Sequence, residues 1–328
     1  MNATTTDRPV VRTRVGWTDL LWLIRRQHRW MLVGTGTLVL VWISALLLLR
    51  IAAPARGPMG TWDSNPLVDL AKIMGATPMI FGLLIAVFWA APLVSREYEQ
   101  RTTTMVWSQD ITSSRWLASK IVLLGSIAAG LAAALGASAG FMMRGINDAR
   151  DRPAFLAFSE VGLFETAPHL QAAYAAFGFA LGLAMSAITR RTVVAMAVTL
   201  AVYVGVRILV IAGWRPFYED PVRQTTPIHG QLTNGDTIDQ NPLYVAGGFL
   251  NSAGEPAELP IECLSKNSLS DDEINNCFAD AGITHRFNDY QPADRLDSFQ
   301  LVETAIFIVF TAILIGLAWM WIRRFGRT

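Results

Sequence analysis

SREYEQRTTTMVWSQDITSSRWLASK, residues 95–120, is a polar stretch between two long apolar runs. A helix needs about 20 apolar residues to cross a bilayer, and each run is that long. The stretch therefore lies at a membrane face. An excess of basic residues favours the cytoplasmic face. The basic residues here are Arg96, Arg101, Arg115 and Lys120, against the acidic Glu97, Glu99 and Asp110.

The composition places the whole chain among integral membrane proteins. Of its 328 residues, 52% are hydrophobic and only 16% are charged, whereas a soluble domain has about 25% charged residues. We therefore expect an all-α polytopic membrane protein. The net charge of +1 gives no reason to expect a nucleic-acid partner. The sequence has no GxxxxGK[ST] loop, so we expect any ATP to bind to another polypeptide.

Six apolar runs are long enough to form transmembrane helices. They cover residues 31–49, 74–94, 121–143, 171–189, 192–213 and 302–322. Only Arg190 and Arg191 separate the fourth run from the fifth, which predicts a tight helical hairpin. The expected parts are a cytoplasmic tail with an amphipathic helix (1–30), five helices with a polar loop at 95–120 (31–213), an extracellular domain (214–301) and a sixth helix with a cytoplasmic tail (302–328).

The distribution of charge predicts the orientation. The first 30 residues contain six arginines, and the loop 95–120, the Arg190-Arg191 pair and the C-terminal tail are also basic. The segment 214–301 instead holds five basic and 14 acidic residues. Basic segments stay in the cytoplasm. We therefore expect a multi-pass plasma-membrane protein with both termini in the cytoplasm.

The two cysteines, Cys263 and Cys277, both fall in the segment expected outside. Because exported surfaces are oxidising, they either form a disulfide, which would contribute roughly 3 kcal/mol by closing a loop of about 15 residues, or remain separate thiols. A capping box beginning at Ser270 and a stop at Gly282 predict a helix between them. We expect a mixed, disulfide-linked ectodomain between helices five and six.

An amphipathic helix precedes the first span. Apolar residues recur at helical spacing and arginines follow them, which is typical of a helix lying in the headgroup layer. This helix either anchors the first span or acts as an elbow that transmits force. Its residues are Trp17, Leu20, Leu21, Ile24, Arg25 and Arg26.

The loop 95–120 resembles the loop after the second helix of ABC-2-type transporter permeases. The pattern here runs Glu97, Thr102, Ser114, Arg115, Trp116, Leu117 and Lys120. The stretches AAYAAFGFALGLAMSAITRRTVVAMAVTL (172–200) and YQPADRLDSFQLVE (290–303) look like the actinobacterial branch of that family, whose six-helix subunits are ABCG-like. One departure is Arg101-Thr102, where the family usually has Gly-Thr, and it leaves the conformation of the loop open.

The resemblance implies the permease half of an exporter. In that family the elbow helix and this loop dock on a separate ATPase subunit, which binds ATP and Mg, and two permease copies or paralogues enclose a pathway. It implies no cofactor and no catalytic or metal residue in this chain. The residues expected to couple to the ATPase are Glu97, Tyr98, Glu99, Arg101, Thr102, Trp107 and Arg115.

Two sets of residues within the spans are candidates for the pathway. Thr199, Tyr203 and Arg207 recur every four residues and form one polar stripe. Charge inside a span usually faces a protein interior, but Arg207 is close enough to the outer end to reach the headgroups instead. An apolar face, which is either packing or a wall for a hydrophobic or amphipathic substrate, is formed by Phe81, Ile85, Phe88 and Trp89.

Two other functions compete with transport. An intramembrane enzyme is disfavoured, because the four histidines are scattered and the spans show no paired carboxylates. A membrane-anchored sensor or envelope-assembly protein would use the acidic ectodomain to bind a ligand. The loop 95–120 separates these functions, because an exporter needs it to bind an ATPase and an anchored receptor does not.

In the spans, Gly178, Gly182 and Ser186, like Gly136 and Gly140, predict close helix packing.

Overall fold

The structure is a computed structural model of the chain. It describes residues 16–53, 66–100, 112–150, 153–158, 162–228, 242–259 and 271–325. Within these ranges six helical stretches are long and apolar enough to cross a membrane, as predicted. They are Arg29–Ala52, Pro66–Glu99, Ser114–Asp148, Pro168–Thr189, Thr192–Phe217 and Ala293–Arg324.

The elements follow one another along these stretches. α1 (Trp17–Gln27) precedes the first span, α2 (Arg29–Ala52). The second contains α3 (Pro66–Gly75), α4 (Thr77–Leu84), the π-helical turn η1 (Ile85–Ala90) and α5 (Ala91–Glu99). The third contains α7 (Ser113–Lys120), η2 (Ile121–Gly125) and α8 (Ser126–Asp148). After η3 (Leu163–Thr166) come α9 (Pro168–Thr189), α10 (Thr192–Leu209), η4 (Val210–Trp214) and η5 (Arg215–Phe217), and η6 (Ala293–Arg295) leads into α13 (Leu296–Phe325).

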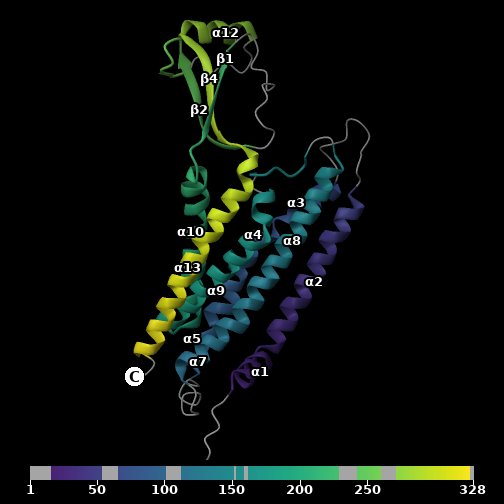
Figure 1. Cartoon of the computed structure of the whole chain (residues 1–328), viewed down its shortest axis with the longest axis vertical. Helices are drawn as coiled ribbons and strands as arrows, with labels where there is room; N and C mark the ends of the chain where they lie inside the picture. The colour runs from purple at the N-terminus through teal and green to yellow at the C-terminus, as the bar shows by residue number, and fades with distance from the viewer. Residues whose placement is uncertain are drawn as a thin grey trace, which may run out of the picture.

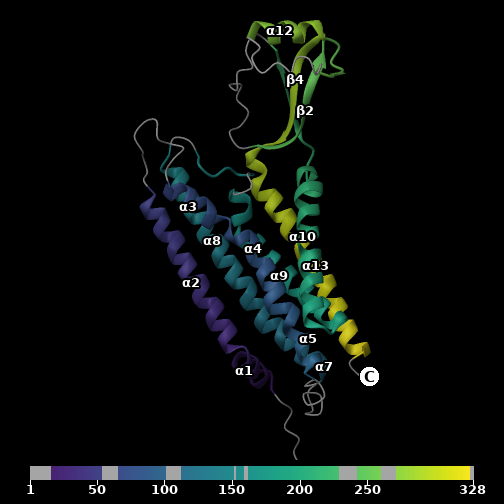
Figure 2. The same cartoon turned by 180° about the vertical axis from the view of Figure 1, so that it is seen from behind.

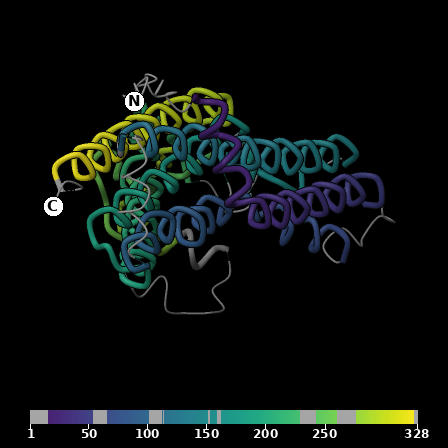
Figure 3. Tube along the Cα trace, turned by 90° about the horizontal axis from the view of Figure 1, so that it is seen from below, coloured from purple at the N-terminus to yellow at the C-terminus, as the bar shows by residue number. Residues whose placement is uncertain are grey.

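The spans form an elongated bundle with a small sheet at one end (Figures 1 and 2). We name the two ends the sheet end and the α1 end; α7 and the last turn of α13 lie at the α1 end. α9 has the largest buried share of the six spans and contacts α4, α5, α8, α10 and α13. α1 runs in a different direction from α2 and contacts α7 (Figure 3). α9 is therefore the helix around which the bundle packs.

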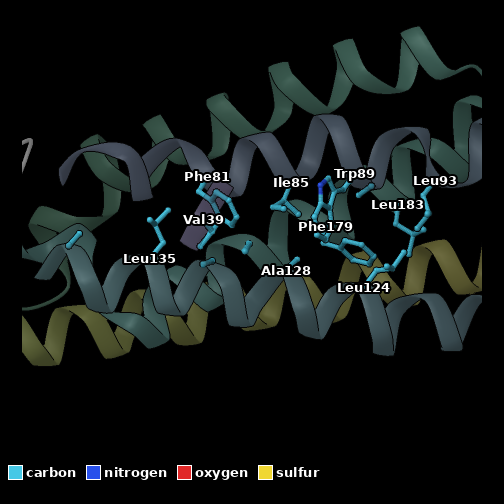
Figure 4. Close-up of a cluster of buried hydrophobic side chains, with 14 of the residues drawn as sticks. Val39, Phe81, Ile85, Trp89, Leu93, Leu124, Ala128, Leu135, Phe179 and Leu183 are labelled. Carbon is cyan, nitrogen blue, oxygen red and sulfur yellow. The ribbon is translucent and has the colours of Figure 1, made fainter. Parts of the chain in front are cut away.

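A large apolar cluster fills the space between the second span, α8 and α9 (Figure 4). Phe81, Ile85 and Trp89 of the second span belong to this cluster together with Phe179 of α9, which lies beside Trp89, and all four are buried. Lipid tails are as apolar as these side chains, so the cluster stabilises the bundle through close packing rather than through removal from water.

A two-residue turn joins α9 to α10, which confirms the predicted hairpin. α9 ends at Thr189 and α10 begins at Thr192. Arg190 has φ 54°, the left-handed conformation that commonly terminates a helix. This conformation lets the chain reverse within two residues.

Between η5 and α13 the chain forms a four-stranded antiparallel sheet with the order β1-β4-β2-β3. The strands are β1 (Val222–Pro227), β2 (Leu243–Asn251), β3 (Pro256–Ala257) and β4 (Ile283–Gln291). The mixed ectodomain expected between helices five and six therefore contains a sheet, and the all-α class applies to the spans alone. The pairing of β1 with β4 joins Arg223 to Asp289, residues too far apart in the sequence for a local pattern to reveal.

The predicted helix of this region is α12 (Asp271–Asp280). Gly282 follows it with φ +68°, the conformation that ends a helix at glycine. Cys277 lies in α12, whereas Cys263 lies outside the described residues. The disulfide between them stays a prediction.

Candidate functional site

At the α1 end, α5, α7 and α10 are joined by polar contacts. Lys120 is fully buried and its Nζ lies 2.5 Å from Oε1 of Glu97. The same ammonium group lies 4.0 Å from the ring centroid of Trp116. The ion pair therefore links the end of α5 to the end of α7.

Glu99 makes the link from α5 to α10. Its two carboxylate oxygens accept hydrogen bonds from the backbone N–H and the hydroxyl of Thr192, each at 2.8 Å. A carboxylate at this position offsets the unpaired N–H groups and the dipole at the start of α10. Beside it, the guanidinium of Arg190 lies 5.1 Å from the ring centroid of Tyr98.

Glu97, Tyr98 and Glu99 are the last residues of α5, so they continue the second span without a break. α7 begins at Ser113, and the hydroxyl of Thr112 accepts a hydrogen bond from the N–H of Arg115. Arg101, Thr102 and Trp107 lie outside the described residues.

The predicted elbow helix is α1, and it packs on the bundle by one face. Leu20 and Ile24 are buried, and Leu21 is half-buried. Trp17 is exposed, and Cζ of Arg115 of α7 lies 5.5 Å from the centroid of its ring. Arg25 and Arg26 are exposed on the opposite face. α1 thus touches the same helix that Glu97 holds.

His28 joins α1 to α2. Its Nε2 is buried and has no hydrogen-bond partner among the described residues. Burial, and then the positive charge of Lys120, lower the pKa of His28 to about 4. The imidazole is therefore neutral at physiological pH.

The predicted polar stripe of α10 faces the interior of the bundle. Thr199, Tyr203 and Arg207 are all buried. Arg207 is 6% exposed and is bound to carboxylates, so the alternative in which it reaches the headgroups is wrong. The hydroxyls of Thr199 and Tyr203 are buried without hydrogen-bond partners among the residues that the structure describes.

The predicted apolar face of the second span is only partly formed. Phe81, Ile85 and Trp89 point into the core, whereas Phe88 is 60% exposed. The π-helical turn η1 covers positions 85–90 and places more residues in each turn than an α-helix does. Phe88 is therefore rotated away from the face that α-helical spacing predicts.

The sheet end contains a buried cluster of two arginines and two glutamates, which we call the Arg–Glu cluster: Arg207, Arg215, Glu165 and Glu303. Glu165 of η3 accepts one hydrogen bond from each arginine, both at 2.8 Å. Glu303 of α13 accepts bonds at 2.9 Å from Nε and Nη2 of Arg215 and at 3.1 Å from Nη1 of Arg207. The cluster therefore joins η3, α10, η5 and α13.

Aromatic side chains complete the surroundings of the cluster. The guanidinium of Arg207 lies 3.8 Å from the ring centroid of Tyr174, and that of Arg215 lies 3.8 Å from the ring centroid of Phe164. Tyr174 also donates a hydrogen bond to Glu303, at 2.5 Å. The four charges balance one another and are shielded from solvent and lipid.

Sequence reasoning identified Arg207 but missed the other three members of the cluster. The sequence shows no paired carboxylates within the spans, but the fold brings Glu165 to the same two arginines that bind Glu303. One signal was available: Glu303 lies inside the sixth predicted span, where a carboxylate needs a buried partner. Glu165 gave no comparable signal, because it lies before the fourth span and not inside a predicted span.

Residues 59–215 match the family model described as ABC-2 membrane transporter related. This region is similar to that family. The match covers slightly less than half of the chain. The ABC-2-related region runs from α3 to Arg215 and so includes the α5–α7–α10 contacts and three members of the Arg–Glu cluster. No curated protein and no solved structure matches the chain.

Proposed function

We propose that the chain is the membrane-spanning permease subunit of an ABC exporter and works with a separate ATP-binding subunit. The match of residues 59–215 to the ABC-2 membrane transporter related family carries this proposal. The six membrane-length helices agree with it. In this proposal ATP and Mg bind to the partner subunit, and this chain moves the substrate but catalyses no reaction.

The proposed orientation places the α1 end in the cytoplasm and the sheet outside the plasma membrane. Both termini are then cytoplasmic. The basic segments of the sequence support this orientation. A second copy of the chain, or a paralogue, would complete the pathway.

The proposed ATPase-coupling surface combines the end of α5, the start of α7 and α1. A movement imposed there has two routes into the bundle, through Glu97 to Lys120 of α7 and through Glu99 to Thr192 of α10. α10 carries the stripe Thr199, Tyr203 and Arg207. Coupling would then reach a substrate pathway along α10, and the apolar surroundings favour a hydrophobic or amphipathic substrate. The full set of proposed coupling residues is Glu97, Tyr98, Glu99, Arg101, Thr102, Trp107 and Arg115.

The test is to purify the tagged full chain from its native membrane and to identify the proteins that accompany it. We expect a stoichiometric ATP-binding subunit. Glu99→Lys is expected to lower the amount of that subunit at least tenfold, because Glu99 is exposed at the proposed surface. Thr192→Val is the matched control, because it removes the hydroxyl that donates to Glu99 but keeps the carboxylate and the backbone N–H of residue 192.

The outcomes separate three possibilities. Loss of the subunit with Glu99→Lys but not with Thr192→Val supports docking through Glu99. Equal loss with both variants assigns Glu99 an internal role in holding α10 and contradicts its docking role. A chain that purifies without any ATP-binding protein contradicts the exporter and favours the membrane-anchored sensor or envelope-assembly protein.

A further inference from the structure

Glu165 reaches the Arg–Glu cluster on a segment that turns back into the bundle. A Cβ on Gly136 would lie 3.1 Å from the carbonyl oxygen of Thr166, and a Cβ on Gly140 would lie 2.8 Å from its hydroxyl. Gly136 lies about 12 residues before the end of α8, which is roughly 18 Å along the helix. η3 is therefore packed beside the outer half of α8 and not beyond its end.

The backbone of η3 is satisfied by side chains from neighbouring helices. Gln300 of α13 donates to the carbonyl of Phe164 at 3.0 Å, and Gln171 of α9 donates to the carbonyl of Glu165 at 2.5 Å. Non-helical backbone at membrane depth is tolerated only where protein or a water-filled cavity surrounds it. The carbonyl groups of η3 are therefore hydrogen-bonded within the protein although the segment is not α-helical.

The two carboxylates of the cluster are held differently. Glu303 lies on the 30-residue helix α13 and also accepts hydrogen bonds from Tyr174 and Tyr218. The carboxylate of Glu165 has hydrogen bonds from the two arginines, and it lies on a turn of four residues. Glu303 is therefore held in place by a long helix. Glu165 can leave the two arginines if the short segment η3 moves.

Removal of Glu165 would leave two buried guanidinium groups with one carboxylate. An uncompensated charge in a buried site is strongly unfavourable. Any movement of η3 away from the arginines therefore requires another anion in its place. Arginine binds carboxylates and phosphates alike, through paired hydrogen bonds.

η3 also shows what kind of molecule fits the site. Phe164, next to Glu165 in the chain, lies against Arg215 and against the ring of Phe158, with centroids 5.9 Å apart. Phe158 in turn packs on Phe299 of α13 at 5.8 Å. The segment thus presents a carboxylate joined to an apolar body.

We propose that Glu165 and Phe164 are the internal occupants of a binding site for an amphiphile with a carboxylate or phosphate headgroup, which pairs with Arg207 and Arg215 when η3 withdraws. This proposal rests on the proposed transport function and names the substrate class: an anionic amphiphile. The headgroup replaces the Glu165 carboxylate, and the apolar body replaces Phe164. The charge of the site stays balanced throughout the exchange.

The test measures binding of cis-parinaric acid, a fluorescent fatty acid, to the purified full chain in nanodiscs by energy transfer from tryptophan. Glu165→Gln is expected to bind the acid at least tenfold more tightly than the wild type, because the competing carboxylate is gone. Glu303→Gln is the matched control: it changes the net charge equally but leaves Glu165 in place, so we expect little gain. The methyl ester should show no gain with any variant.

Competing ligands and a double variant define the headgroup and the site. Dodecyl phosphate should compete with the acid, whereas inorganic phosphate should not, because it has no apolar body. Glu165→Gln combined with Arg207→Gln restores the charge balance and should abolish the gain. Equal binding by the wild type and Glu165→Gln, or an equal gain with Glu303→Gln, would overturn the proposal.

A second measurement does not depend on the variants folding. In the wild type, saturating cis-parinaric acid should increase deuterium uptake in peptides covering 163–166, because η3 withdraws. Unchanged uptake at saturation contradicts the exchange. Both measurements are made on this chain alone, so their failure is distinguishable from the absence of an ATP-binding partner.

Discussion

Lys120 carries a charge in a fully buried position, and Glu97 compensates for it at 2.5 Å. Loss of one member of a buried ion pair costs about 3–5 kcal/mol, whereas replacement of both by apolar residues is often neutral. We therefore expect Glu97→Leu to lower the thermal unfolding midpoint strongly and Glu97→Leu/Lys120→Met to recover most of the loss. Tryptophan fluorescence of the purified chain measures both. A double variant no more stable than Glu97→Leu would show that Lys120 does not depend on Glu97.

His28 gives a pH dependence at the same end of the bundle. Burial and the nearby Lys120 lower its pKa to about 4 in the folded chain, against 6.5 in the unfolded chain. Between pH 6.5 and 4 the unfolded chain binds more protons at this residue, so stability falls as pH falls. We expect the decrease in unfolding midpoint from pH 7 to pH 5 to be a few degrees smaller in His28→Gln. The other titrating groups are common to both proteins, so identical decreases would contradict the lowered pKa.

Among the elements, α9 depends on glycine where it crosses the second span. A Cβ on Gly182 would lie 2.4 Å from the carbonyl oxygen of Ala86 and 2.8 Å from the backbone nitrogen of Ala91. Backbone atoms cannot move aside as a flexible side chain can, so Gly182→Ala should separate α9 from η1 and α5. We expect a loss of about 1–3 kcal/mol, the usual cost of overpacking.

The matched control is Gly205→Ala, since a Cβ there meets nothing within 4 Å. Alanine is also the better helix former, so this variant should be neutral or slightly stabilising. Thermal unfolding of the two variants side by side measures the difference. Equal effects of Gly182→Ala and Gly205→Ala would show that close packing at Gly182 contributes nothing to stability.

Sequence patterns predicted the elements well where the signal is local. The six spans follow from long apolar runs, the hairpin from Arg190-Arg191, and α12 from its capping box and Gly282. Phe88 shows where this reasoning stops, because a single π-helical turn rotates a residue off the expected face. The strand pairing within the expected mixed ectodomain was not predicted for a related reason: β1 and β4 join residues about 60 apart, which no local pattern reveals.

At the scale of the whole molecule, the charges that matter most could not be predicted from spacing. Glu165, Arg207, Arg215 and Glu303 come from four elements, and only the packing of α9, α10 and α13 brings them together. The positive-inside pattern is different, because it depends on composition alone and needs no contact to be known. It is therefore the property of the whole chain that a simple experiment can test directly.

The orientation prediction concerns the two ends of the bundle. In a Cys263→Ser/Cys277→Ser background, Thr18→Cys introduces a thiol in α1, and Ser252→Cys introduces one in the turn after β2. Both positions are exposed. Because basic segments stay inside, a membrane-impermeant maleimide should label Ser252→Cys in intact cells and Thr18→Cys only after lysis. Labelling of Thr18→Cys in intact cells, with Ser252→Cys protected, would reverse the orientation and would place the proposed coupling surface out of reach of a cytoplasmic ATPase.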